Sequence, residues 1–201
     1  VRDGAGGANG NTQNGEGYAG PYGGPYFTFG FYQPSFSLVN SYKTDPVTGL
    51  PLIQTFNDFD VKNDQGIPSA QPFVPYTGTL DARLDWTVGR RGIPLLDWGV
   101  MPGQAWIRQQ SVAGPYVHIK NTNPQSEPNA RESASTAVNY CMIRFADVLL
   151  WAAEVEVEVG TLAKAEEYVN MIRARAADPD GWVYKRCQSF RRGFHYAGSK
   201  L

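Results

Sequence analysis

The chain is poor in cysteine and histidine, with only two of each among its 201 residues. Cys141 and Cys187 are too few to build a disulfide framework, and their separation fits none of the common zinc-site spacings. His118 and His195 each lack a second histidine four residues away and a neighbouring nucleophile. These shortages exclude the usual zinc and catalytic-histidine arrangements, so we predict no metal, no cofactor and no catalytic residue.

The sequence also lacks an excess of charge and a long apolar run. Its 18 Lys and Arg residues stand against 19 Asp and Glu, which gives a net charge of −1. A balance this even provides no overall field that would attract nucleic acid or an anionic membrane, so no nucleic-acid partner is predicted. No stretch reaches the roughly 18 consecutive apolar residues of a membrane-spanning helix. We therefore expect one globular domain or part of a larger one.

Glycine, proline and aromatic residues are abundant instead: 22 glycines, 14 prolines and 13% aromatic residues. Residues 1–32 begin with a Gly/Asn-rich run and continue as GYAGPYGGPYFTFGFY, in which rings alternate with Gly and Pro. This much glycine excludes a helix. Large rings are costly to leave in water, so they need a packing partner or a ligand.

Residues 33–138 are typical of short helices and loops. The stretch 34–44 (PSFSLVNSYKT) predicts a helix that opens with Pro34 and Ser35. The stretches DPVTGLP, KNDQGIPS and VPYTGT are turns by composition, because Asp, Pro and Gly each favour turn conformations. Two Leu-Asp-Trp units, at 84–86 and 96–98, then flank the sequence GRRG.

A helical period dominates residues 139–178. Apolar residues recur at spacings of three and four, which predicts a helix over about 139–159 that Gly160 ends in the C′ position. Thr161 is expected to cap a second helix. Two amphipathic helices joined by so short a turn lie antiparallel, and small residues such as Ala153 and Ala165 allow them to approach closely. The unit is typical of a tetratricopeptide-type hairpin, which must pack on other helices because it cannot bury both faces alone.

Segment 135–185 (STAVNYCMIRFADVLLWAAEVEVEVGTLAKAEEYVNMIRARAADPDGWVYK) closely resembles the SusD/RagB family of outer-membrane nutrient-binding lipoproteins. Three upstream segments also look like members of that family, in the same order. They are FYQPSFSLVNSYKTDPVTGLPL, FNDFDVKNDQG and PFVPYTGTLDARLDWTVGRRGIPLLDWG. The resemblance covers residues 20–185 and rests on several separate motifs.

The resemblance implies a mostly α-helical fold, a superhelix of tetratricopeptide-like hairpins with long irregular loops that form a ligand-binding face. It implies a single partial domain over 1–201. Family members are lipid-anchored on the outside of the cell and cap a TonB-dependent barrel transporter of the SusC type. They bind oligosaccharides or polysaccharides and pass them inward without cleaving them.

Members of the family are more than twice as long as this chain, so we expect an internal or truncated fragment. The signal segment, the lipobox cysteine and the early helix pairs are then absent from it. The tail 186–201 (RCQSFRRGFHYAGSKL) is basic, carries no acid and resembles nothing in the family. A truncated or frame-shifted gene is the expected cause.

If the chain binds glycans, ring faces must stack on sugar C–H surfaces and planar polar groups must hold hydroxyl pairs. Two regions offer these groups. The first surrounds the GRRG motif, where Arg91, Gln104 and Arg108 also lie, and its predicted contacts are Trp86, Arg90, Asp97, Trp98 and Trp106. The second is the aromatic loop, with Tyr22, Tyr26 and Tyr32.

Structural alternatives stand beside each of these predictions. Trp86 and Trp98 can be core rings, Arg90 and Asp85 a buried ion pair, and the aromatic loop can pack against the helical scaffold. A hydrolase would need two carboxylates 5–10 Å apart, drawn from Asp58, Asp60 and Asp64 or from Asp85 and Asp97. The acids at 58–64 are also weighed as calcium ligands, although the EF-hand pattern fails. A helical-repeat scaffold for protein interactions, without glycan binding, is the remaining alternative.

Overall fold

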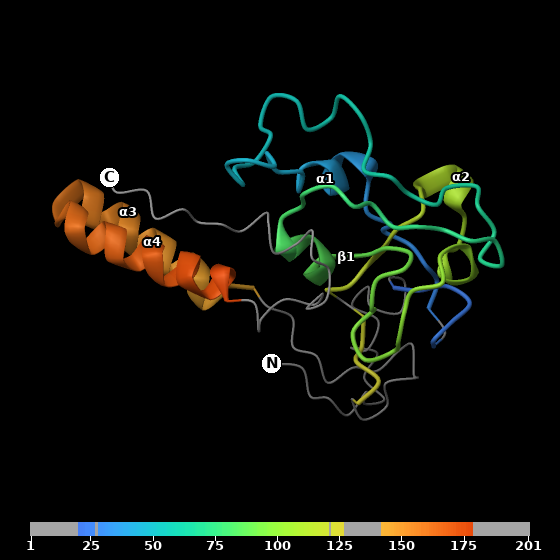
Figure 1. The fold of residues 1–201 in the computed structure, drawn as a ribbon. Helices are drawn as coiled ribbons and strands as arrows, with labels where there is room; N and C mark the ends of the chain where they lie inside the picture. The colour runs from blue at the N-terminus through green and yellow to red at the C-terminus, as the bar shows by residue number, and fades with distance from the viewer. Residues whose placement is uncertain (1–19, 27, 121, 127–141, 179–201) are drawn as a thin grey trace, which may run out of the picture.

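The computed structural model describes residues 20–26, 28–120, 122–126 and 142–178, which Figure 1 draws in colour. The tail 186–201 and the opening 1–19 lie outside the described residues. Within these ranges the regular elements are mostly helical and are joined by long loops, as predicted. In chain order they are α1 (Phe36–Asn40), the 3-10 helix η2 (Ala82–Trp86), β1 (Val88–Gly89), the 3-10 helix η3 (Gln104–Trp106), α2 (Gln110–Ala113), β2 (Val117–His118), α3 (Phe145–Val159) and α4 (Leu162–Ala177).

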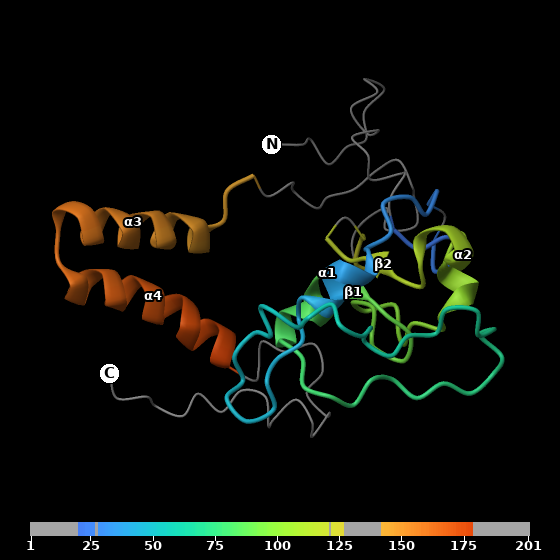
Figure 2. The same ribbon diagram turned by 90° about the horizontal axis from the view of Figure 1, so that it is seen from above.

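The described residues form two parts (Figures 1 and 2). The described residues from 20 to 126 make a loop-rich part, here called the loop module, which holds α1, α2, the two strands and both 3-10 helices. Helices α3 and α4 stand to one side of it as an antiparallel hairpin. Among the described elements, each of these two helices packs extensively only against the other.

Two clusters of buried apolar side chains form the core of the loop module. The first contains Val39, Val61, Leu80, Ala82, Leu84, Val88 and Tyr116, and the second contains Leu95, Met101, Ile107, Val117 and Ile119. Strands β1 and β2 pair antiparallel, with Val88 opposite His118 and Gly89 opposite Val117, and so join the two clusters. A Cβ at Gly89 would lie 2.6 Å from Val117 Cγ2 and 2.8 Å from Leu95 Cδ1. Glycine is therefore required where the clusters meet.

His118 on β2 gives the loop module a predictable pH dependence. Its Nε2 is buried without a hydrogen-bond partner, and burial lowers the pKa of the imidazole from 6.5 to about 4. The unfolded chain therefore binds a proton more readily than the folded chain. The stabilisation is complete above the unfolded pKa and is lost as the pH falls towards the folded one. We expect the free energy of unfolding to drop by about 2 kcal/mol between pH 7.5 and pH 5.

Urea denaturation at several pH values measures this loss. His118→Gln removes the titrating group and should flatten the curve over the same interval, whatever its effect on absolute stability. Protonation of a carboxylate whose pKa is lowered below the ordinary value, such as Asp97, destabilises the fold only at more acidic pH. Such groups therefore do not contribute to the change between pH 7.5 and pH 5. An equal slope in the two proteins would contradict the assignment.

Helix α1 confirms the predicted start and shortens the predicted end. The Ser35 hydroxyl accepts the N–H of Leu38 at 3.1 Å, as expected of an N-cap. The helix ends at Asn40 rather than at residue 44. Lys43 leaves the helical path because it pairs with Leu80 in a β-bridge and buries its ammonium over the Phe59 ring, 3.7 Å from the centroid. Tertiary contacts thus override the local helical pattern.

Helix α3 begins at Phe145, later than the start near residue 139 that periodicity predicts. Residues 142–144 are not helical, and residues 139–141 lie outside the described ranges. Arg144 sets the boundary with extended backbone at φ −94° and ψ 151°. Its backbone N–H donates to Asp147 at 3.0 Å, and its guanidinium bonds both oxygens of the same carboxylate. The Asp147 carboxylate thus accepts the backbone N–H of the N-cap residue, which is one half of a capping box, and holds the Arg144 side chain beside it.

Gly160 ends α3 as predicted, but by a different route. Its φ of −121° is not the left-handed conformation of a C′ glycine. A Cβ at this position would lie 2.0 Å from the Glu156 carboxylate, so glycine makes room for that side chain. The carboxylate accepts the N–H of Thr161 at 3.1 Å. Thr161 in turn caps α4 by accepting the N–H of Lys164 at 3.3 Å, which confirms the predicted cap.

The hairpin has a small-residue contact and a large exposed apolar surface. Ala153 and Ala165 are its buried residues, as expected for helices that approach closely. Many apolar side chains of α3 remain exposed, among them Phe145, Trp151, Val155 and Val159. The described residues contain this one hairpin, and a superhelix of several hairpins is not shown. Within the described ranges, no helix has both the length and the hydropathy to span a bilayer.

Candidate functional site

The aromatic loop 20–32 lies against segment 104–108, far away in the sequence. The backbone N–H of Tyr22 donates to the carbonyl of Trp106 at 2.9 Å. A Cβ at Gly24, where φ is +156°, would lie 2.6 Å from the Trp106 indole nitrogen. Glycine lets the loop backbone approach the indole this closely. The glycines that exclude a helix here thus bring two distant segments into contact.

Four rings of this loop are exposed. Tyr22, Phe29, Phe31 and Tyr32 expose 38%, 41%, 44% and 74% of their surface. Phe29 and Phe31 stack on each other with centroids 6.5 Å apart and planes 22° apart. Exposed rings contribute little to stability, and a group of them on one loop is typical of an interaction surface. These four rings and Arg108 are called the aromatic patch below.

Arg108 lies against two rings of the patch, those of Phe31 and Tyr22. Its guanidinium carbon lies 4.3 Å from the ring centroid of Phe31 and 5.5 Å from that of Tyr22, within cation–π range. Its Nη1 donates to the carbonyl of Phe29 at 2.7 Å. A Cβ at Gly30 would lie 2.7 Å from Tyr22 Cβ and 2.9 Å from Arg108 Cβ, so the cation and the rings close over a glycine. The guanidinium is therefore held in place by contacts within the protein.

Tyr26 and Trp98, both predicted contacts, support the loop from within. Tyr26 is buried and stacks on Trp98 with ring centroids 5.3 Å apart. The Tyr26 hydroxyl accepts the N–H of Asn123 at 2.9 Å, and the Trp98 indole donates to the carbonyl of the same asparagine at 2.6 Å. Both polar tips are thus satisfied by one residue. The pair anchors the aromatic loop to segment 122–126.

Asp97 organises that same segment. Burial alone would raise the pKa of its carboxyl, but the N–H groups of Gln125 and Ser126 donate to it and bring the pKa below its ordinary value. The charged form is therefore favoured by hydrogen bonds to backbone. Asp97 remains exposed at the surface.

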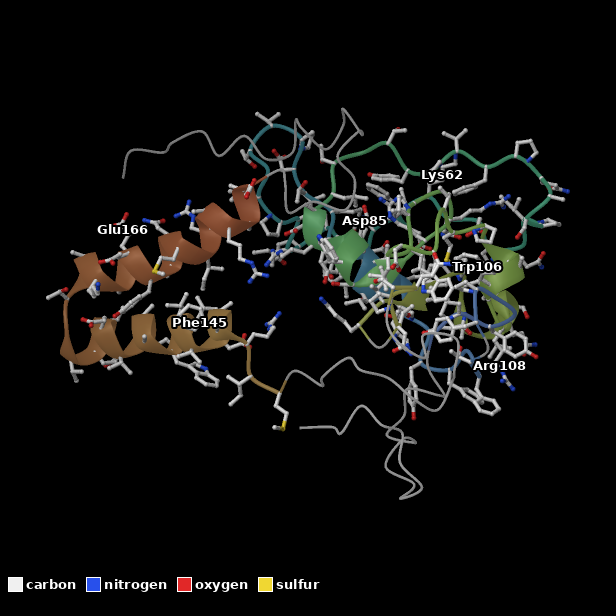
Figure 3. The ribbon with its side chains drawn as sticks, turned by 90° about the horizontal axis from the view of Figure 1, so that it is seen from below. Lys62, Asp85, Trp106, Arg108, Phe145 and Glu166 are labelled. Carbon is white, nitrogen blue, oxygen red and sulfur yellow. The ribbon has the colours of Figure 1, made fainter. Side chains whose placement is uncertain are left out.

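Arg90 and Trp86 lie in another part of the loop module. The Nε and Nη2 of Arg90 donate to the two oxygens of Asp85 at 2.7 and 3.1 Å, and both side chains are buried. This is the ion pair that the sequence offered as the structural alternative for Arg90. Trp86 is 43% exposed on η2, not a core ring. Figure 3 shows Asp85 nearer the hairpin than Trp106 and Arg108, so η2 is separate from the aromatic patch.

A second buried ion pair supports the segment that carries Arg108. Arg91 lies 3.7 Å from Asp64, and both side chains are buried. Gln110 adds a weak hydrogen bond to the same carboxylate at 3.4 Å. Burial raises the pKa of Asp64, while the charge of Arg91 acts to lower it. Gly103 covers the pair, because its Cβ would lie 2.2 Å from the Asp64 carboxylate.

Four of the five acids weighed as catalytic or calcium-binding groups, namely Asp60, Asp64, Asp85 and Asp97, have structural partners. Asp60 accepts the side-chain N–H of Asn40 at 2.7 Å, Asp64 pairs with Arg91, and Asp85 pairs with Arg90. Within the described ranges, no three histidine, cysteine or acidic side chains converge as a metal site would require. The described residues therefore offer aromatic and cationic surface rather than a cluster of acids.

The structure brings together only part of the predicted set. Tyr22 and Trp106 meet at the aromatic patch, and Tyr32 belongs to the same loop, whereas Trp86 and Arg90 lie apart. Phe29 and Phe31, which are among the rings of the Gly- and Pro-rich run, and Arg108, which lies near the GRRG motif, were not among the predicted contacts. Their signals were the alternation of rings with glycine and the position of Arg108 two residues after Trp106. Neither signal reveals that the two segments touch.

Comparison with known proteins supplies the family. No curated protein sequence matches the chain. The profile of the SusD family (SusD/RagB) matches residues 2–192, beyond the 20–185 covered by the resemblance seen in the sequence. The matched range ends within the basic tail, so residues 186–192 lie inside it and residues 193–201 lie outside it. Since the matched range spans most of its length, the chain belongs to the SusD family, whose members are non-catalytic, glycan-binding surface lipoproteins of the outer membrane that work with SusC-like transporters.

Proposed function

We propose that this chain binds an oligosaccharide or polysaccharide at the aromatic patch, as the surface subunit of a TonB-dependent uptake complex. The observation that carries the proposal is the group of exposed rings on the aromatic loop, two of which, Phe31 and Tyr22, lie against Arg108. Tyr22, Phe29, Phe31 and Tyr32 are between 38% and 74% exposed, although burial would stabilise each of them. Rings that stay exposed in this way are explained if a bound ligand covers them.

The composition of the patch suits a sugar. Ring faces stack on the apolar C–H faces of a pyranose, and a fixed guanidinium donates hydrogen bonds to its oxygens. The loop is held by the Tyr26–Trp98 stack and by the contact between Gly24 and Trp106. A surface fixed in this way loses little conformational entropy when the ligand binds.

The predicted residues take different parts in this proposal. Tyr22 and Tyr32 contact the ligand, while Trp106, Tyr26 and Trp98 position the loop. Asp97 and Trp86 are both exposed outside the patch, where they contact the parts of a longer glycan that extend beyond it. Arg90 acts through its ion pair with Asp85 and not on the ligand.

The α3–α4 hairpin carries an exposed apolar face that other helices could cover. Apolar side chains such as Trp151, Val155 and Val159 are more than half exposed along α3. In the lipid-anchored protein that caps the transporter, this face of α3 packs against neighbouring helix pairs of a tetratricopeptide-like superhelix. The same observation supports the second candidate, an interaction scaffold that binds no glycan.

Single ring removals test the glycan-binding proposal. Phe31→Ala and Tyr32→Ala should each weaken binding to the preferred polysaccharide by about 1–3 kcal/mol, the range for a base stacked on an aromatic side chain. Affinity electrophoresis measures the change. Phe145→Ala removes a ring that is 70% exposed on α3 and serves as the matched control, with unchanged retardation expected. Equal retardation of all four proteins would favour the scaffold.

A further inference from the structure

The cation at the centre of the aromatic patch distinguishes it from a purely apolar sugar platform. In the described part of the chain, Arg83, Arg90, Arg91 and Arg144 each pair with an aspartate. Arg108 is exposed and has two rings and one carbonyl as its partners, with no carboxylate among them in the described ranges. Within the described ranges, its positive charge therefore has no carboxylate counter-ion beside the exposed rings of Phe31 and Tyr22.

The geometry around Arg108 also orients its hydrogen-bond donors. A guanidinium carries five N–H groups in a planar fork, and the carbonyl of Phe29 accepts one of them. The rings of Phe31 and Tyr22 restrict the side chain further. An orientation fixed by three contacts presents the remaining donors to solvent with little entropy left to lose on binding.

We infer that the aromatic patch selects glycans that carry carboxylate groups, that is, polymers of uronic acids, and that Arg108 reads the carboxylate. This inference rests on the proposed glycan-binding function. A planar carboxylate matches the guanidinium fork in a bidentate pair, which a neutral hydroxyl does not. The flanking rings of Phe31 and Tyr22 take the C–H face of the same sugar or of its neighbour.

Matched polymers test the charge requirement. Polygalacturonate, alginate and hyaluronan are each compared with their carboxyl-reduced forms by affinity electrophoresis of the whole chain. At least one acidic polymer should retard the chain more than its reduced form does, and added salt should weaken that retardation. Equal retardation by the acidic and reduced forms would overturn the inference while leaving glycan binding intact. Absence of retardation by these polymers and by a panel of neutral polysaccharides would overturn both proposals.

Variants assign the effect to Arg108. Arg108→Gln should bind the acidic polymer about tenfold more weakly or worse, because a charge-assisted hydrogen bond is lost. Arg108→Lys keeps the charge without the planar fork, so its affinity for the acidic polymer should lie between those of the wild type and Arg108→Gln. Lys62→Gln is the control, since Lys62 is also exposed beside a ring, 5.4 Å from the centroid of Phe73, and lies away from Arg108 in Figure 3. Equal losses in the Lys62 and Arg108 variants would reduce the effect to net charge and overturn the assignment.

Discussion

Replacing Asp85 by alanine is expected to lower the free energy of unfolding by about 3–5 kcal/mol, the usual cost of breaking a buried ion pair. Asp85 and Arg90 are 1% and 7% exposed and are joined by two hydrogen bonds. Without the carboxylate, Arg90 keeps its charge in a buried site next to the first apolar cluster. A loss of this size is comparable with the total stability of a small domain.

Urea denaturation followed by tryptophan fluorescence measures the effect. The double variant Asp85→Leu/Arg90→Met should recover most of the loss, because it removes both charges together. Glu167→Ala breaks the exposed pair with Lys164 on α4 and should leave the midpoint nearly unchanged. If Asp85→Ala unfolded at the wild-type midpoint, the buried pair would have no stabilising role.

The second large effect concerns Gly103, which should not tolerate even alanine. Its φ of +87° is strained for any residue with a side chain. The new methyl group would also lie 2.2 Å from the Asp64 carboxylate and 2.7 Å from Arg91 Cδ. Strain and overpacking together should cost roughly 2–5 kcal/mol in the free energy of unfolding.

Gly66→Ala separates the two causes. Gly66 has a similar φ of +76°, but a Cβ there meets nothing within 4 Å. Gly66→Ala therefore reports backbone strain of about 1 kcal/mol, and the excess in Gly103→Ala reports the steric conflict with the Arg91–Asp64 pair. Segment 104–108 follows Gly103 directly, so Gly103→Ala should also weaken glycan retention. Equal destabilisation by the two substitutions would show that the pair moves aside freely.

Local features of the fold were predictable because they depend on neighbouring residues. Ser35 and Thr161 act as helix caps because each is followed closely by the N–H group that it accepts. The hairpin follows from apolar periodicity and from small residues at Ala153 and Ala165. Asp85 and Arg90 are five residues apart, so their pairing was one of two open interpretations.

Contacts between distant segments were beyond the sequence. The hydrogen bond from Arg108 to Phe29 spans 79 residues, and the one from Asn123 to Tyr26 spans 97. No period or spacing relates such positions, so the aromatic loop and segment 104–108 looked like two separate candidates. A contact between distant segments also shortens helix α1, because Lys43 forms a β-bridge with Leu80 instead of continuing the helix. The family resemblance supplied the general class of function, and side-chain geometry was needed to propose a site.

The central claim is glycan binding at the aromatic patch. Hydrogen–deuterium exchange tests it most directly, when it is measured with and without the polysaccharide that retards the chain most strongly. The patch is built from two segments, so the ligand should slow amide exchange in 28–32 and in 104–108 together. Segment 82–86, which carries Trp86 on η2, should change less. Protection confined to η2 or to the α3–α4 hairpin, with 28–32 and 104–108 unchanged, would contradict the placement of the site.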